Sequence, residues 1–94
     1  MPRLFSLLML LCLTFNAHAD SYITRLLNKP VPGGVAVIDL GTSTAAPKAT
    51  YQNRPVLVVK EQNNWLAIVG IPLTVKPGTE RITSGGQNLP FVVG

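Results

Sequence analysis

The sequence predicts a small all-β domain, an antiparallel β-sandwich of the immunoglobulin-like kind, behind a signal-peptide helix. Eight Gly and eight Pro are spread over 94 residues and separate apolar runs of strand length, a pattern typical of all-β folds. No window keeps apolar residues at the helical spacing i, i+3, i+4 without a helix breaker. The fold class therefore follows from the breakers, the run lengths and the missing helical period.

Residues 1–19 have the composition of a secretory signal. Arg3 supplies the charged start, residues 4–15 are apolar apart from a Ser and a Thr, and Ala17-His18-Ala19 is a small-x-small cleavage site. The twelve-residue run is shorter than the about 20 residues that a membrane-spanning helix needs. We expect cleavage after Ala19 and a periplasmic or secreted domain over residues 20–94. Lipidation of Cys12 is disfavoured, because a large leucine precedes it.

Removal of this signal takes away the single cysteine, Cys12, and the single histidine, His18. Residues 20–94 then offer no disulfide, thiol nucleophile, histidine base or His/Cys metal site. We therefore predict no catalytic, cofactor-binding or metal-binding residue and no enzymatic activity for this chain alone. A small exported domain without disulfides needs a well-packed core or the support of another domain.

The first half of the chain predicts one clear strand. Residues 22–27 fit a short strand or a helical turn, ended by Pro30. Residues 35–40 are apolar and β-branched and form a strand that alternates between two faces. Residues 41–50 are small and polar, which predicts a loop.

A β-hairpin is the strongest local signal. Residues 56–60 and 65–71 form two apolar arms around the turn at 61–64. Because both arms are almost continuously apolar, we expect the pair to be central and covered on both faces. Trp65, at the start of the return arm, is expected to belong to the core.

Two more strands complete the chain, at residues 79–83 and 89–93, after turns at Pro77-Gly78 and at residues 84–86. The last strand ends one residue before Gly94 and would expose an unpaired edge, which proteins usually cover. We therefore expect the sandwich to lack its last strand or strands and the sequence to be the front part of a longer protein.

Acidic residues supply the alternative catalytic hypotheses. Asp39-Leu40-Gly41-Thr42 is similar to the Asp-x-Gly-Thr loop of aspartic proteases, whose short forms work as dimers with two carboxylates sharing a proton. The segment 68–70 would be its apolar-apolar-Gly partner, although the spacing is short for that fold. Glu61 and Glu80 could join Asp39 in a glycosidase-like carboxylate pair, but predicted turns and strand ends are places where charges are simply solvated.

The basic residues do not form a patch. With the signal removed, seven Lys and Arg face four acids, a net charge of +3. They are scattered along the chain and do not interleave with aromatic residues as in a nucleic-acid-binding face. We predict no nucleic-acid partner and no permanent membrane span. The basic residues are Arg25, Lys29, Lys48, Arg54, Lys60, Lys76 and Arg81.

Four segments, in order, resemble one known domain: residues 31–37 (VPGGVAV), 55–58 (PVLV), 65–73 (WLAIVGIPL) and 76–79 (KPGT). They are similar to the N-terminal β-sandwich of exported zinc metallopeptidases of the lysostaphin/LytM type. Those enzymes cleave the peptide cross-links of peptidoglycan. The resemblance covers nearly all of residues 22–94.

The resemblance implies a role without catalysis. In that family, His-x-x-x-Asp and His-x-His motifs of a separate C-terminal domain hold the zinc, and neither motif occurs here. The chain is thus expected to be a non-catalytic accessory domain of a peptidoglycan-directed zinc endopeptidase whose catalytic domain is absent. Its expected partners are that catalytic domain and peptidoglycan, with zinc bound only by the catalytic domain. The competing hypothesis is a self-contained periplasmic immunoglobulin-like binding or adaptor module.

Overall fold

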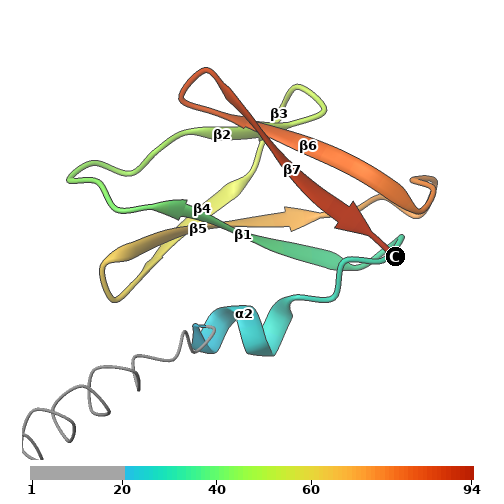
Figure 1. The fold of residues 1–94 in the computed structure, drawn as a ribbon, viewed down its shortest axis with the longest axis horizontal. Coiled ribbons are helices and arrows are strands. Elements are labelled where there is room, and N and C mark those ends of the chain that lie inside the picture. Colours follow the sequence, from blue (N-terminus) through green and yellow to red (C-terminus); the bar gives the residue numbers. More distant parts are fainter. Residues whose placement is uncertain (1–20) are drawn as a thin grey trace, which may run out of the picture.

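The computed structural model describes residues 21–94, which form two antiparallel sheets and one short helix (Figure 1). The predicted signal peptide and its cleavage site lie outside the described residues. The first sheet has the strand order β1-β5-β4 and the second has the order β3-β2-β6-β7. The all-β class is confirmed. The elements are α2 (Tyr22–Leu27), β1 (Val35–Gly41), β2 (Ala49–Tyr51), β3 (Arg54–Pro55), β4 (Leu57–Glu61), β5 (Asn64–Gly70), β6 (Gly78–Ser84) and β7 (Gln87–Val93).

The core lies between the two sheets. Alternation along each strand sends every second side chain inward, and Val69 and Ile82 are completely buried. Three alanines give the sheets room to approach each other. Members of the core are Ala36, Ala49, Tyr51, Ala67, Val69, Ile71, Ile82 and Val93, with Ile38, Leu40, Val56, Val58, Val75, Leu89 and Phe91 packed against them.

Residues 54–61 join the two sheets along one side of the sandwich. Arg54 and Pro55 pair with β2 of the second sheet, and the chain then passes through Val56 into β4 of the first sheet. The amide of Val56 donates to the carbonyl of Ala49 at 3.0 Å. One continuous segment therefore contributes a strand to each sheet. As a result, β5 has no partner strand on this side beyond the pair of Ile68 with Leu57.

Residues 29–34 join the sheets along the other side. Lys29 and Val35 exchange two backbone hydrogen bonds of 2.8 and 3.0 Å, and the amide of Gly94 donates to the carbonyl of Pro30 at 2.8 Å. Gly34 sits inside this crossing, where a Cβ would lie 2.2 Å from the carbonyl oxygen of Lys29. Only glycine fits at this position without a shift of the backbone.

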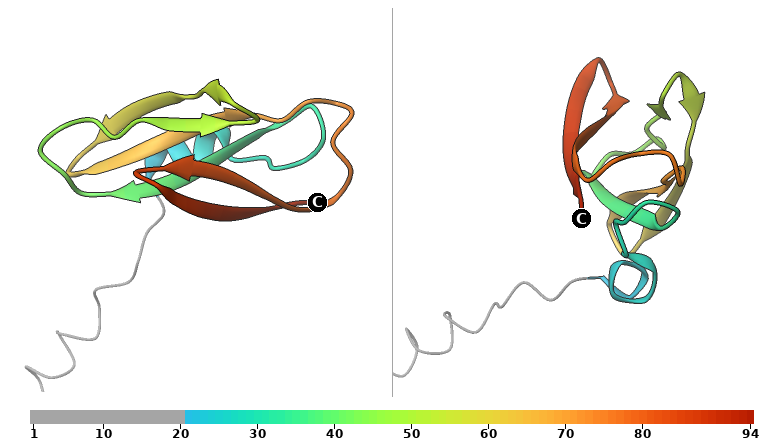
Figure 2. Two further views of the ribbon diagram at one scale, coloured as in Figure 1. Left: turned by 90° about the horizontal axis from the view of Figure 1, so that it is seen from above. Right: turned by 90° about the vertical axis from the view of Figure 1, so that its right-hand side faces the viewer.

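The segment 22–27, ambiguous in the sequence, is a helix. Ser21 caps it, because its hydroxyl accepts the amide of Thr24 at 3.1 Å. The helix lies against the outer face of the β1-β5-β4 sheet (Figures 1 and 2). On that face Leu66 is 3% exposed, although it lies outside the main core cluster.

The hairpin prediction is confirmed, but its expected burial is wrong for one arm. β4 and β5 are antiparallel neighbours, with Leu57 opposite Ile68 at one end and Glu61 opposite Asn64 at the other. β5 is the central strand of its sheet. β4 is an edge strand, and Leu57 on it is 62% exposed. Trp65 is only partly buried and is not a core member. Because the chain enters β4 from the second sheet through Val56, the sequence of residues 54–61 spans two different environments.

The strand at residues 89–93 is confirmed as part of β7, and the strand at 79–83 as part of β6. β7 pairs with β6 along seven positions and forms the edge of the second sheet. Pro90 stands at the middle of this edge strand, where a missing amide hydrogen discourages the pairing of another strand. The predicted loop 41–50 is wrong at both ends, because Gly41 still belongs to β1 and Ala49 already begins β2.

Candidate functional site

Asp39 is held by its neighbours at the surface of β1. One carboxylate oxygen accepts the amide of Gly41 at 2.7 Å, and the side-chain amide of Asn64 donates to both oxygens at 3.1 and 2.9 Å. Asp39 pairs with Leu66, whereas residues 68–70 lie opposite Val35–Val37. The structure therefore does not bring the two segments of the hypothetical aspartic protease loop together.

Glu61 fastens helix α2 to the end of the β4–β5 hairpin. Its two carboxylate oxygens accept the amides of Tyr22 and Ile23 at 2.7 and 3.0 Å. These amides belong to the first turn of the helix, where backbone N–H groups have no partner within the helix. A negative charge also interacts favourably with this end of a helix. The role of Glu61 is structural.

Glu80 lies within β6 and binds Tyr51. The Tyr51 hydroxyl donates to a Glu80 carboxylate oxygen at 2.6 Å, and the Tyr51 ring packs edge-on against Phe91. Tyr51 is 6% exposed. Burial, followed by the hydrogen bond to Glu80 and its negative charge, raises the pKa of Tyr51 to about 12. The sequence predicts Glu80 at a strand end, but it stands inside a strand and completes a partly buried contact.

Alkaline pH is expected to destabilise the domain through Tyr51. The unfolded chain loses this proton near the ordinary tyrosine pKa of 10.0 and the folded chain near 12. Between these values the unfolded state binds fewer protons, so stability falls as pH rises. The loss should reach about 2–3 kcal/mol by pH 12. Denaturant unfolding of wild type and Tyr51→Phe at several pH values tests this, because the variant should lack this part of the decline. A stability difference that does not change with pH would contradict the assignment.

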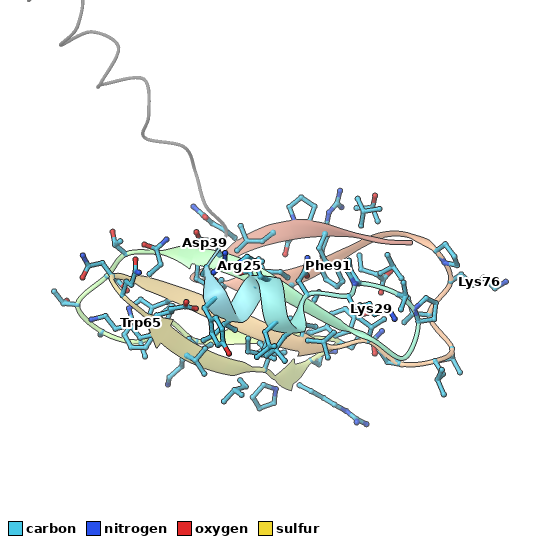
Figure 3. All side chains as sticks on the ribbon, turned by 90° about the horizontal axis from the view of Figure 1, so that it is seen from below. Arg25, Lys29, Asp39, Trp65, Lys76 and Phe91 are labelled. Atoms are coloured by element: carbon cyan, nitrogen blue, oxygen red, sulfur yellow. The ribbon has the colours of Figure 1, made fainter. Side chains whose placement is uncertain are left out.

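The three side-chain carboxylates of residues 21–94 thus accept hydrogen bonds from different partners. Within that described part of the chain, no group of three or more His, Cys, Asp or Glu side chains could hold a metal ion. Asp39 and Trp65 lie toward one end of the molecule and Lys76 lies at the opposite end (Figure 3). Each of these carboxylates accepts hydrogen bonds from groups of the fold itself, Asp39 from Gly41 and Asn64, Glu61 from Tyr22 and Ile23, and Glu80 from Tyr51.

Trp65 is a fixed surface residue at the hairpin end. Its indole N–H donates to the carbonyl of Ser43 at 2.9 Å, and the Lys60 ammonium lies 5.4 Å from the ring centroid. These contacts tie the loop after β1 to the hairpin. With one ring face under Lys60, Trp65 contributes to local structure.

Shallow grooves at the surface of residues 21–94 include two that border the strands described above. The first, here called the seam groove, lies where the segment 54–61 leaves one sheet for the other and has a volume of about 270 Å³. The second, of about 340 Å³, lies near Asp39, Leu40, Gln87 and Leu89. The sequence does not predict the seam groove, because it depends on where β4 leaves its sheet. Its walls include Arg54, Pro55, Leu57, Ile68, Gly70 and Pro72.

The described helix is short. Over residues 21–94, no helix combines the length and the apolar character required to traverse a lipid bilayer.

Comparison with known proteins gives two findings. The family model of the peptidase family M23 N-terminal domain matches residues 28–94. The crystal structure of a candidate M23 peptidase from Pseudomonas aeruginosa is similar, with a TM-score of 0.74 and 53% sequence identity. The similarity covers 79% of this chain and 35% of that chain, so this sequence corresponds to about a third of that protein. No curated protein gives a significant match.

Proposed function

Because the chain belongs to the family of M23 peptidase N-terminal domains, as the match over residues 28–94 establishes, we propose that it is the accessory domain of an exported, peptidoglycan-directed zinc endopeptidase. In this proposal the chain carries out no hydrolysis. It packs against a catalytic domain and holds it in position. The observation that carries the proposal is the 53% identity to a candidate M23 peptidase of which this chain spans 35%.

The chemistry of the residues supports a non-catalytic role. Residues 20–94 contain neither His nor Cys, and a catalytic zinc site is typically built from three protein ligands that include histidine. The side-chain carboxylates of residues 21–94 bind Asn64, the first turn of α2 and Tyr51. Zinc ligands and a zinc-bound water would therefore come from the catalytic domain, while this domain supplies a rigid neighbouring surface.

Export is the second part of the proposal. It is supported by the signal-like sequence of residues 1–19 and by the absence of any need for a reducing compartment, since residues 20–94 have no thiol. A periplasmic or secreted location would bring the domain to peptidoglycan. N-terminal sequencing of the protein after export should find Asp20 as the first residue.

A domain exchange tests the accessory role. The matching region of the Pseudomonas aeruginosa relative is replaced by residues 20–94 of this chain, and zinc-dependent release of soluble fragments from purified peptidoglycan is measured. We expect the chimera to retain most of the release shown by the relative. A deletion variant of the relative that lacks the region should lose at least about tenfold, a loss equivalent to about 1.4 kcal/mol.

Two outcomes would overturn the proposal. If the chain alone releases peptidoglycan fragments and a chelator abolishes this activity, the domain is itself catalytic. If the deletion variant is as active as the chimera, the domain has no accessory role in hydrolysis. The relative with its own region intact serves as the reference in both measurements.

A further inference from the structure

The seam groove contains an open position in the β1-β5-β4 sheet, next to Gly70. Both backbone groups of Val35 bond to Lys29. The pair Val35–Gly70 therefore exchanges no hydrogen bonds. In an antiparallel sheet such a residue directs its N–H and C=O toward the opposite neighbour. The backbone of Gly70 consequently faces the side of β4.

No strand occupies that side at Gly70. The β4–β5 pairing ends at Leu57–Ile68, and the next residue in register, Pro55, already pairs with Thr50 in the other sheet. Gly70 is exposed, and the strand register gives it no partner on that side. The groove thus presents one backbone donor and one backbone acceptor, spaced as in a sheet.

The walls of the groove suit a short peptide. Pro55 and Pro72 line it together with Ile68 and with Leu57, which is 62% exposed. The volume of about 270 Å³ is near the lower end of the range for ligand pockets, which favours a ligand of one or two residues. An extended peptide could bond to Gly70 and place an apolar side chain on Leu57 and Ile68.

Arg54 gives the groove its charge. Its side chain is exposed at the groove wall. The side-chain carboxylates of residues 21–94 accept hydrogen bonds from backbone amides, from Asn64 and from Tyr51. None of these hydrogen bonds comes from Arg54. A guanidinium is well suited to a carboxylate, because it can donate two parallel hydrogen bonds.

We propose that the seam groove binds the C-terminal end of a short extended peptide. The peptide backbone pairs with Gly70, its last apolar side chain packs on Leu57 and Ile68, and its terminal carboxylate binds Arg54. Main-chain pairing at an open sheet position and capture of a terminal carboxylate are both established modes of peptide recognition. This binding activity goes beyond the accessory role and does not depend on it.

The test is a titration of the ¹⁵N-labelled chain with N-acetyl-alanyl-alanine and with its C-terminal amide. The free acid should shift the Gly70 amide resonance and bind at least about tenfold more tightly than the amide, with a Kd on the millimolar scale. Arg54→Gln should weaken binding of the acid at least about tenfold. Arg81→Gln removes an exposed arginine from β6, outside the groove, and should change binding less than about twofold.

Gly70→Leu tests whether the peptide binds in the groove or is attracted to the protein only by general charge effects. An added Cβ at Gly70 meets nothing within 4 Å, so the fold tolerates a side chain there. The leucine should fill the groove and abolish the shifts, while the spectrum stays that of a folded protein. Equal binding of acid and amide, equal losses in Arg54→Gln and Arg81→Gln, or no response of the Gly70 amide would each overturn the proposal. Shifts at Gly70 that depend on protein concentration without peptide would assign the groove to self-association instead.

Discussion

Ile82→Ala is expected to lower the free energy of unfolding by about 2–5 kcal/mol. Ile82 is completely buried between the two sheets, so the truncation leaves a cavity that the neighbouring strands can only partly close. A small domain without disulfides has little stability in reserve. The variant should therefore be largely unfolded near its former melting temperature, as measured by chemical denaturation and by circular dichroism.

Val92→Ala is the matched control for this prediction. Val92 stands on the neighbouring strand β7 and is 68% exposed, so its truncation should change stability by less than about 0.5 kcal/mol. The difference between the two variants' losses in unfolding free energy separates the effect of burial from the effect of placing alanine in a strand. If both variants lose the same stability, the described core between the sheets is not what holds the domain together.

Gly34→Ala is expected to cost about 3 kcal/mol or more, beyond the usual range for overpacking. The new Cβ would lie 2.2 Å from the carbonyl oxygen of Lys29, a backbone atom that cannot rotate away. That carbonyl accepts the amides of Val31 and Val35. The methyl group should therefore break the crossing that joins β1 to the end of β7.

Gly70→Ala provides the comparison for Gly34→Ala. A Cβ at Gly70 meets nothing within 4 Å, and its backbone requires no left-handed conformation. The two substitutions are chemically identical and differ only in their surroundings. Gly70→Ala should alter the denaturation midpoint little. A Gly34→Ala variant of wild-type stability would show that the residue 29–35 crossing is not formed as described.

The strands that the sequence predicts correctly are those whose signal is local. Alternation and turn residues predict β1, the β4–β5 hairpin and the last two strands within a few residues. β2 and β3 are missed, because Ala49–Tyr51 continues a small, polar run and Arg54–Pro55 is only two residues long. Their pairing depends on β6 and on the passage of the chain between sheets. An apolar sequence also cannot distinguish a central strand from an edge strand such as β4.

The roles of the acidic residues could not be predicted in the same way. The sequence places Glu61 in a solvated turn, yet it binds two amides located 38 and 39 residues earlier in the chain. Glu80 meets Tyr51 across 29 residues. Such partners are set by the tertiary fold, so residue type and spacing alone leave catalytic alternatives open. The family resemblance in residues 31–79 is confirmed, because it rests on the order of whole segments.

The attachment of α2 by Glu61 has a consequence for the order of folding. A helix of six residues is too short to be stable in isolation. The amides of its first turn can bond to the Glu61 carboxylate only after residue 61 has been synthesised and the β4–β5 hairpin has formed. In a chain that is synthesised from its N-terminus, the first element of residues 21–94 is thus among the last to form. α2 should also be the first element to open in the native state, which makes it a cooperative unit separate from the sandwich.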